Sequence, residues 1–447
     1  MSIQRKAAAI AAGVASLAML LGPGAAAAAN FEYELSALAG QSDNITRVST
    51  DEVDETIAGV GLKFSLDHDS TRIKADLVGD FAYNDYLDDT YDSEVLGNFA
   101  GDATFALVQE HLNWAVSDYY GQVLVDPFTP PTPDNRENLN YFSTGPDAMF
   151  AFGSRTRLSV GARYGDSAYE DQPFDSSMVL GQIGLSRVLS GASSLGFTAR
   201  QQQVEYDESA LNGDYDQSEA FLTYSMDGAR TSIDADLGYT KLERDVAVED
   251  EDGTLLRVKV SRKVGSHSEF KVTAGQEFAS SATAFAGDQA GGEIDLDTSG
   301  SRQTIQPFKN EYASLDWVIT GRRTAITFDV AWSDHDYGDS ADLNQTMVTF
   351  GASVRRDLTA ALNVSLNYDQ SESDFEVNGD YSDQLVGLEL NWQMSRMLSL
   401  GFVADRYDRS SDLTGGDYTE NRFWLSLNYG RGVPRSRMGA TQTPEAE

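Results

Sequence analysis

The side chains best able to do acid–base or nucleophilic chemistry are few in this chain, and they form no catalytic motif. Its 447 residues include four histidines and no cysteine. Asp334-His335-Asp336 resembles part of a catalytic triad in residue types alone, because no serine forms a recognisable nucleophile motif with any histidine. The absence of cysteine excludes a disulfide scaffold and a cysteine-ligated metal site. We therefore expect no enzyme activity and no cofactor.

Carboxylates are the most abundant reactive groups, with 70 Asp and Glu against 33 Lys and Arg, for a net charge of −37. Such a chain repels nucleic-acid phosphates, so we expect no nucleic-acid partner. Carboxylate-rich loops could hold divalent cations, but the closest approach to a calcium-loop spacing, Asp295-Leu296-Asp297, is incomplete. We expect no metal site. The hydrophobic content of 41% is too high for a disordered acidic chain.

Residues 1–29 have the pattern of a cleaved secretory signal. Arg5 and Lys6 precede an apolar stretch from Ala7 to Leu21, and Ala27-Ala28-Ala29 supplies a cleavage site. An uncleaved anchor is the alternative, but the apolar stretch is short for a membrane-spanning helix. Cleavage would leave 31 basic and 70 acidic residues, a net charge of −39.

Residues 30–430 alternate with period two, and no helical periodicity is visible. In 324–333, 362–369 and 386–394, apolar side chains alternate with polar or small ones, as in strands with one apolar face. We count about twenty such segments, each long for a strand of a soluble protein. This pattern predicts an all-β fold: a transmembrane, antiparallel, up-and-down outer-membrane β-barrel of about twenty strands (range about 16–20). Residues 431–447 would form a polar periplasmic tail.

The connections fall into two alternating classes. Short ones, such as 153–154 and 321–323, alternate with long acidic ones, such as 85–92, 166–175 and 279–307. Outer-membrane barrels have short periplasmic turns and long external loops, which predicts both termini in the periplasm. A secreted soluble all-β protein would explain the strand pattern but not this alternation.

The apolar face should contact lipid, and the polar face should line the lumen. Aromatic residues stand near segment ends on the apolar face: Trp317, Trp332, Trp392, Tyr239, Tyr368 and Tyr429. Trp424 is on the opposite face, so either it lines the lumen or the register breaks there. The predicted lumen-lining residues carry both signs of charge: Asp76, Asp80, Arg157, Arg163, Arg200, Asp234, Asp236, Arg257, Lys259, Asp316, Asp329 and Glu389. This mixture predicts a wide hydrated passage rather than a ring of one charge.

Basic residues gather at the predicted short turns: Arg155, Arg187, Arg230, Arg262, Lys263, Arg322, Arg323, Arg355, Arg356 and Arg396. Acidic loops at one end and basic turns at the other should orient the field in the lumen along its axis.

One connection is unusually stiff because it is rich in proline. Its residues are Pro127, Pro130, Pro131, Pro133, Asp134, Asn135 and Arg136. Two arrangements are open at this point. The loop could fold inward as a constriction or gate, or it could cap the barrel from outside.

Several stretches resemble the β-barrel porin family associated with exopolysaccharide and exosortase (PEP-CTERM) gene systems. The resemblance rests on Asp-Asn-Arg-Glu-Asn at 134–138, Ser-Thr-Gly-Pro at 143–146, Ser-Asp-Asn-Ile at 42–45 and Gly-Ala-Arg-Tyr at 161–164. It spans the mature chain to about residue 430, and it implies an outer-membrane pore near polysaccharide-export machinery. The chain departs from the usual terminal aromatic of outer-membrane proteins, because Arg431 to Glu447 follow the last strand-like segment.

Our first hypothesis is an outer-membrane pore that exports a hydrophilic polymer, with exopolysaccharide as the first candidate. A general or small-solute diffusion porin is the alternative, and an outer-membrane enzyme or adhesin is the second alternative. Expected partners are outer-membrane lipid and lipopolysaccharide, the barrel assembly machinery, a periplasmic polysaccharide-export protein and the polysaccharide itself. The expected location is the bacterial outer membrane.

Overall fold

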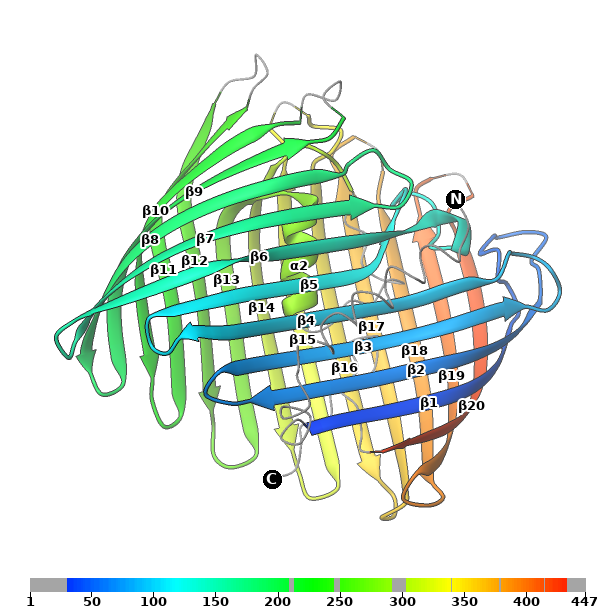
Figure 1. Ribbon diagram of the computed structural model, residues 1–447. Coiled ribbons are helices and arrows are strands. Elements are labelled where there is room, and N and C mark those ends of the chain that lie inside the picture. Colours follow the sequence, from blue (N-terminus) through cyan, green and yellow to red (C-terminus); the bar gives the residue numbers. More distant parts are fainter. Residues whose placement is uncertain are drawn as a thin grey trace.

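A computed structural model of the chain shows a closed barrel of twenty antiparallel strands (Figure 1). It describes residues 30–208, 213–244, 250–291, 303–338, 340–377, 379–413 and 415–431. The predicted signal sequence and the tail beyond residue 431 lie outside these ranges. The barrel closes where β1 pairs with β20, from Tyr33 opposite Arg431 to Ser42 opposite Arg422. The predicted fold class is confirmed.

The strands follow the period-two segments closely, and each pairs with its neighbours in sequence. Their bounds are β1 Asn30–Ser42, β2 Glu55–Asp69, β3 Ile73–Tyr86, β4 Glu94–Val108, β5 Leu112–Leu124, β6 Arg136–Phe152, β7 Thr156–Tyr169, β8 Ser176–Ser190, β9 Ser193–Tyr206, β10 Tyr215–Asp227, β11 Thr231–Arg244, β12 Glu251–Lys263, β13 Ser268–Ala279, β14 Phe308–Thr320, β15 Thr324–Asp336, β16 Gln345–Asp357, β17 Leu362–Phe375, β18 Tyr381–Gln393, β19 Leu398–Ser411 and β20 Tyr418–Arg431. A closed ladder pairs the backbone groups that open sheet edges would expose.

Two classes of connection alternate around the barrel, as predicted. Nine turns of two to four residues join each even-numbered strand to the next, and ten longer loops join each odd-numbered strand to the next. We call the two ends of the barrel the turn rim and the loop rim. β1 begins and β20 ends at the turn rim, at the bottom of Figure 1.

The outer face of the wall is apolar in its central part. On β20, Phe423, Leu425, Leu427 and Tyr429 are all about half exposed on this face. Trp332, Trp392 and Tyr239 are likewise exposed on their strands. Exposed apolar side chains in such a continuous belt are expected where lipid, rather than water, surrounds the wall.

Trp424 lies on the inner face, which resolves the choice between lumen and register break. Pairing of β19 with β20 is continuous from Arg409 opposite Tyr418 to Leu398 opposite Tyr429, so the register does not break. The Trp424 ring covers Gly40, where an added Cβ would lie 2.5 Å from it. It also packs against a buried cluster containing Ile57 and Tyr86. Glycine is therefore required opposite this tryptophan.

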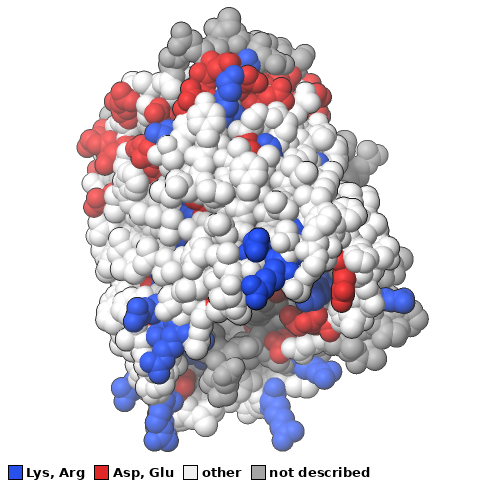
Figure 2. All heavy atoms as spheres, turned by 90° about the vertical axis from the view of Figure 1, so that its left-hand side faces the viewer, with Lys and Arg blue, Asp and Glu red and all other residues white. Residues whose placement is uncertain are grey.

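The charges are sorted along the barrel axis. Figure 2 shows acidic side chains gathered at the loop rim, basic side chains toward the turn rim and a largely uncharged band between them. Among the described residues of the ten loops, Arg47 is the one base.

Helical structure is small but present, contrary to the absence of helical periodicity in the sequence. η1 (Pro133–Asn135) is one 3₁₀ turn, and α2 (Ser281–Gly291) is a helix of 11 residues. α2 is rich in alanine and glycine and has no polar stripe, so it shows no 3.6-residue pattern. No helix among the described residues is long and apolar enough to cross a membrane.

One of the four histidines lies in the last part of β15. β15 continues to Asp336, so His335 belongs to a strand and not to the loop that follows. Its imidazole is buried, with its ring centre 4.5 Å from that of Phe308.

Candidate functional site

The lumen wall carries a network of two arginines and three carboxylates across β9 to β13. The Arg257 guanidinium contacts Glu219 at 3.2 Å and Glu277 at 2.6 Å, with Asp236 at 3.8 Å. Arg200 also contacts Glu219, at 3.3 Å. Each predicted lumen base in this group therefore has acids beside it. Such a wall is hydrated but presents no strong excess of either charge.

Three other predicted lumen residues also form ion pairs. Asp80 pairs with Lys63 at 3.2 Å, Arg163 with Asp147 at 2.5 Å, and Asp316 with Lys271 at 3.7 Å. These pairs join neighbouring strands. They neutralise charge locally, as in the Arg257 network.

The remaining predicted lumen residues are distributed around the wall. Asp234 stands directly opposite Lys259 in the β11–β12 register. Asp76 stands opposite Asp102, and Asp329 opposite Asp316. Arg157 lies on β7 near the turn rim and Glu389 on β18. The twelve residues therefore share a wall but converge on no single point.

The helix α2 lies inside the barrel (Figure 1). It belongs to the longest connection, residues 280–307 between β13 and β14. Phe285 of α2 is buried in a cluster with Tyr119, Leu139 and Tyr169 of β5 to β7. The helix therefore packs against the inner wall across from the strands that it connects.

Residues 303–305, which follow in the same connection, also contact the wall. The Tyr169 hydroxyl donates to Gln303 Oε1 at 3.2 Å. Ile305 packs against a buried cluster that includes Tyr206 and Tyr215. Inward-facing aromatic residues near the loop rim thus provide the surface on which the inserted loop rests.

The proline-rich loop, residues 125–135, has a tightly bonded internal structure. Asn135 Oδ1 accepts the N–H of Asp126 at 2.9 Å. Its Nδ2 donates to the carbonyls of Asp126, Thr129 and Pro130 at 2.7, 3.0 and 3.2 Å. Proline has no backbone N–H, so the prolines of the loop cannot donate to its carbonyls. The side-chain amide of Asn135 pairs with these backbone groups instead. Pro131 is fully buried.

This loop also folds inward and reaches the far side of the mouth. The Phe128 ring centre lies 4.6 Å from that of Phe375 at the end of β17. The Pro131 carbonyl accepts hydrogen bonds from Arg47 Nη1 at 2.9 Å and from Arg136 Nη2 at 2.7 Å. β17 is almost opposite β5 and β6 in the strand order. The loop therefore lies across the mouth at the loop rim, against the end of β17 and beside Arg47.

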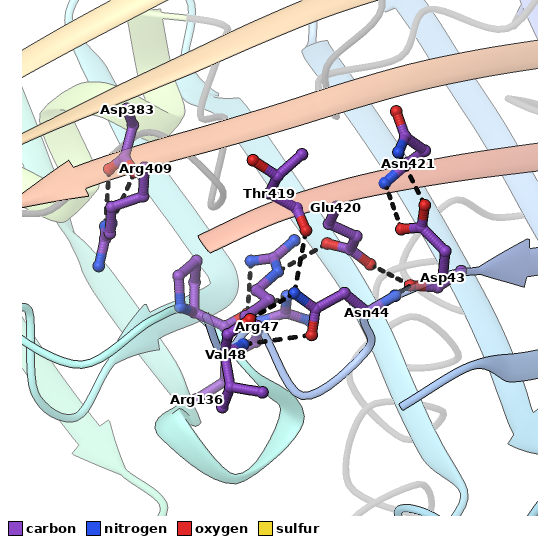
Figure 3. A network of polar contacts seen from close by, with 12 residues as sticks. Asp43, Asn44, Arg47, Val48, Arg136, Asp383, Arg409, Thr419, Glu420 and Asn421 are labelled. Atoms are coloured by element: carbon purple, nitrogen blue, oxygen red, sulfur yellow. Dashed lines mark hydrogen bonds and ion pairs between the residues drawn. The ribbon is translucent and has the colours of Figure 1, made fainter. Parts of the chain in front are cut away.

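Arg47 is held in place by a buried ion pair (Figure 3). Its Nε lies 2.8 Å from Glu420 Oε2, and the two side chains are 3% and 0% exposed. The Ser42 hydroxyl donates to the other Glu420 oxygen at 2.6 Å. Removing one partner of a buried ion pair leaves an uncompensated charge, so neither side chain is replaceable without cost.

Other arginines and tyrosines surround this pair on β18 to β20. Arg409 makes two hydrogen bonds of 2.6 Å to Asp383 and lies 4.3 Å from the ring centre of Tyr381. Arg422 lies 3.9 Å from the ring centre of Tyr407. We call Arg47, Arg136, Asp383, Arg409, Glu420 and Arg422, with Tyr381, Tyr407 and Tyr418, the mouth cluster.

Sequence reasoning identified the proline-rich loop and Arg136 but missed the rest of the mouth cluster. Within this cluster, Arg47 and Glu420 are 373 residues apart in sequence. One signal was present: Arg47 is a lone base in the acidic stretch 43–54. The inserted fold of 280–307 had no such signal beyond its length.

No catalytic or metal centre emerges from the described part of the chain. No three His, Asp or Glu side chains there are placed to hold a metal ion. His335 is buried beside an aromatic ring, which gives substrate no access to it.

Comparison with known proteins gives distant likenesses in structure only. No protein-family model matches the sequence, and no curated protein matches it. The siderophore receptor PirA from Pseudomonas aeruginosa is 9% identical, with a TM-score of 0.43, over 90% of this chain and 80% of PirA. The FrpB iron transporter from Neisseria meningitidis is 8% identical, with a TM-score of 0.46, over 90% and 82%. OccAB3 from Acinetobacter baumannii is 11% identical, with a TM-score of 0.36, over 90% and 99%.

Proposed function

We propose that this protein is an outer-membrane channel for a hydrophilic substrate, with an exported exopolysaccharide as the first candidate. A closed barrel with an apolar outer belt and a polar, charge-balanced lumen supports passage rather than chemistry. The turn rim would face the periplasm and the loop rim the outside. Lipid and lipopolysaccharide would cover the belt, and the barrel assembly machinery would insert it.

The observation that carries the proposal is the pair of loops folded into the mouth. Residues 125–135 contact β17 and the Arg47–Glu420 pair, and α2 (Ser281–Gly291) rests on β5 to β7. An unobstructed barrel of twenty strands would leak small solutes continuously. A polymer channel that works intermittently needs such closure, and the entering polymer would displace the loops.

Export also needs a component that delivers the polymer to the turn rim. The resemblance to barrels of exopolysaccharide gene systems supports a periplasmic polysaccharide-export protein in this role. Basic side chains at the turns (Arg322, Arg323, Arg355 and Arg356 among them) would provide its contact surface or guide the polymer inward.

Deletion of the gene in its native host tests polymer export. We expect secreted polysaccharide to fall to background, and a plasmid copy of the wild type to restore it. The purified barrel in planar bilayers should show higher single-channel conductance after residues 125–135 are replaced by a short Gly-Ser turn. Unchanged secretion in the deletion strain would exclude export as the main role.

A small-solute diffusion porin is the second candidate, and one observation favours it. The four hydrogen bonds of Asn135 stiffen the proline-rich loop, as a permanent constriction requires. Liposomes containing the intact wild type should then swell rapidly with small sugars. Rapid swelling together with normal polymer secretion in the deletion strain would select this function.

A further inference from the structure

We infer that the channel takes an anionic carbohydrate, and that a uronate carboxylate competes with the Pro131 carbonyl for Arg47 and Arg136. Binding of the carboxylate would release the proline-rich loop from the mouth. The inference rests on the proposed function and names the substrate class of that channel. It also assigns a ligand site, formed by two guanidinium groups, at the loop rim.

Two cationic groups converge on one neutral oxygen at this point. Arg47 Nη1 and Arg136 Nη2 donate to the Pro131 carbonyl at 2.9 and 2.7 Å. Hydrogen bonds between ionised partners are roughly twice as strong as neutral ones, and arginine forks match carboxylates in shape. A carboxylate is therefore a stronger acceptor at this site than the carbonyl that occupies it.

The Arg47 guanidinium is preorganised for such a ligand. Glu420 fixes its Nε, and the rings of Tyr407 and Tyr418 lie 5.3 and 5.6 Å from its central carbon. Nη1 is thereby directed at the loop. Glu420 balances the charge of Arg47, so the surplus positive charge that would attract an anion here comes from Arg136 and Arg422 of the mouth cluster.

The distribution of charge over the whole barrel favours the same substrate class independently. Basic side chains at the turn rim would attract a polyanion to that end of the lumen (Figure 2). The acidic loop rim would oppose its exit, but the mouth cluster places four arginines against two carboxylates at that point. The paired charges of the lumen wall offer no ring of acid that would block it. A neutral polymer gains nothing from this arrangement.

Opening requires only the exchange of noncovalent contacts. The carboxylate would bind Arg136 first and Arg47 second. Arg136 is the first residue of β6, directly after the loop. Pro131 would lose both donors, while Phe128 would still contact Phe375 on the far wall. Arg47 would keep Glu420, so the wall itself would not change.

Planar-bilayer recordings with a charged and a neutral trisaccharide test the inference. Trigalacturonate, added on the side of the turn rim, should raise the mean conductance of the wild type roughly tenfold, the ratio expected for about 1.4 kcal/mol of stronger pairing. Maltotriose at the same concentration should leave it unchanged.

Two variants separate the site from general electrostatics. Arg136→Gln should conduct more than the wild type without ligand and should not respond to trigalacturonate. Arg406→Gln, which removes an exposed base of β19 that pairs with Asp408 outside the mouth cluster, should keep the wild-type response. Heat-modifiable migration on gels verifies that each variant is folded, and calorimetric titration of the wild type with trigalacturonate tests binding without any variant.

The outcomes are distinguishable from failure of the proposed function. Equal responses to both trisaccharides, a wild-type response in Arg136→Gln, or no binding by calorimetry would overturn the anionic site while leaving a channel. Absence of conductance even after removal of residues 125–135 would instead reject the channel.

Discussion

At the scale of single residues, Glu420 holds the mouth cluster together. Its two carboxylate oxygens accept hydrogen bonds from Arg47 Nε and from the Ser42 hydroxyl, and the side chain is completely buried. Arg47 in turn donates to the loop that crosses the mouth. A carboxylate on β20 thus determines the position of a loop that begins at β5.

Glu420→Gln should weaken this arrangement because Arg47 would keep its charge in a buried site without its counter-ion. We expect the docked loop to lose roughly 3–5 kcal/mol, measured as faster protease cleavage within 125–135 in the folded barrel. Lys74→Gln is the matched control, since Lys74 and Asp69 form a pair in which both side chains are more than 70% exposed. Equal cleavage rates in the two variants would contradict the buried-pair argument.

Gly40→Ala tests the placement of Trp424 in the lumen. An added Cβ would lie 2.5 Å from the indole, so the ring must move. We expect a loss of about 1–3 kcal/mol and a shift in tryptophan fluorescence. Gly181→Ala is the control, because nothing lies within 4 Å of its added Cβ. An unchanged spectrum in Gly40→Ala would mean that the indole does not cover this glycine.

At the scale of elements, strands and inserted loops have different sources of stability. Each strand is held by two ladders of backbone hydrogen bonds, whereas the inserted loops are held by side chains on distant parts of the wall. Phe285 and Phe128 are the anchors of the two loops. The loops can therefore change without the barrel unfolding.

Phe285→Ala should loosen residues 280–307 and leave the barrel intact. Truncating a buried phenylalanine costs about 3–5 kcal/mol where the site cannot collapse, and that loss falls on the loop. We expect higher and noisier single-channel currents with an unchanged temperature for heat-modified gel migration. A lowered transition temperature with unchanged current would mean that Phe285 stabilises the barrel wall and not the loop.

At the scale of the whole molecule, the sorted charges make the two ends of the lumen unequal. The acidic loop rim and the basic turn rim impose a field along the channel axis. The ion pairs of the wall do not cancel this field, because they are balanced locally.

The current through the channel should therefore rectify, and salt should abolish the effect. Screening lengths fall from about 10 Å at 0.1 M salt to about 3 Å at 1 M. We expect unequal conductance at opposite voltages in 0.1 M KCl and nearly equal conductance in 1 M KCl. Replacing Arg322, Arg323, Arg355 and Arg356 with glutamine should reduce the rectification at low salt. Rectification that persists at 1 M would point to loop movement instead of fixed charge.

Much of the barrel could be predicted from residue patterns because its strands obey a local rule. Successive side chains point to opposite faces, so Leu362, Val364 and Leu366 identify a lipid-facing stripe without knowledge of any partner strand. The alternation of short and long connections then predicts that neighbouring strands are antiparallel and that both termini lie at the same end of the barrel. Trp424 was already assigned to the face opposite lipid by the same rule.

The closure of the mouth was decided only by tertiary structure. Arg47 and Glu420 are 373 residues apart, and no local periodicity relates a loop to the wall it will contact. The proline content of 125–135 indicated stiffness but not which residues the loop would contact. Phe375, Arg136 and Arg47 hold the loop across the mouth, because only the closed barrel brings β17 and β20 across from β5 and β6.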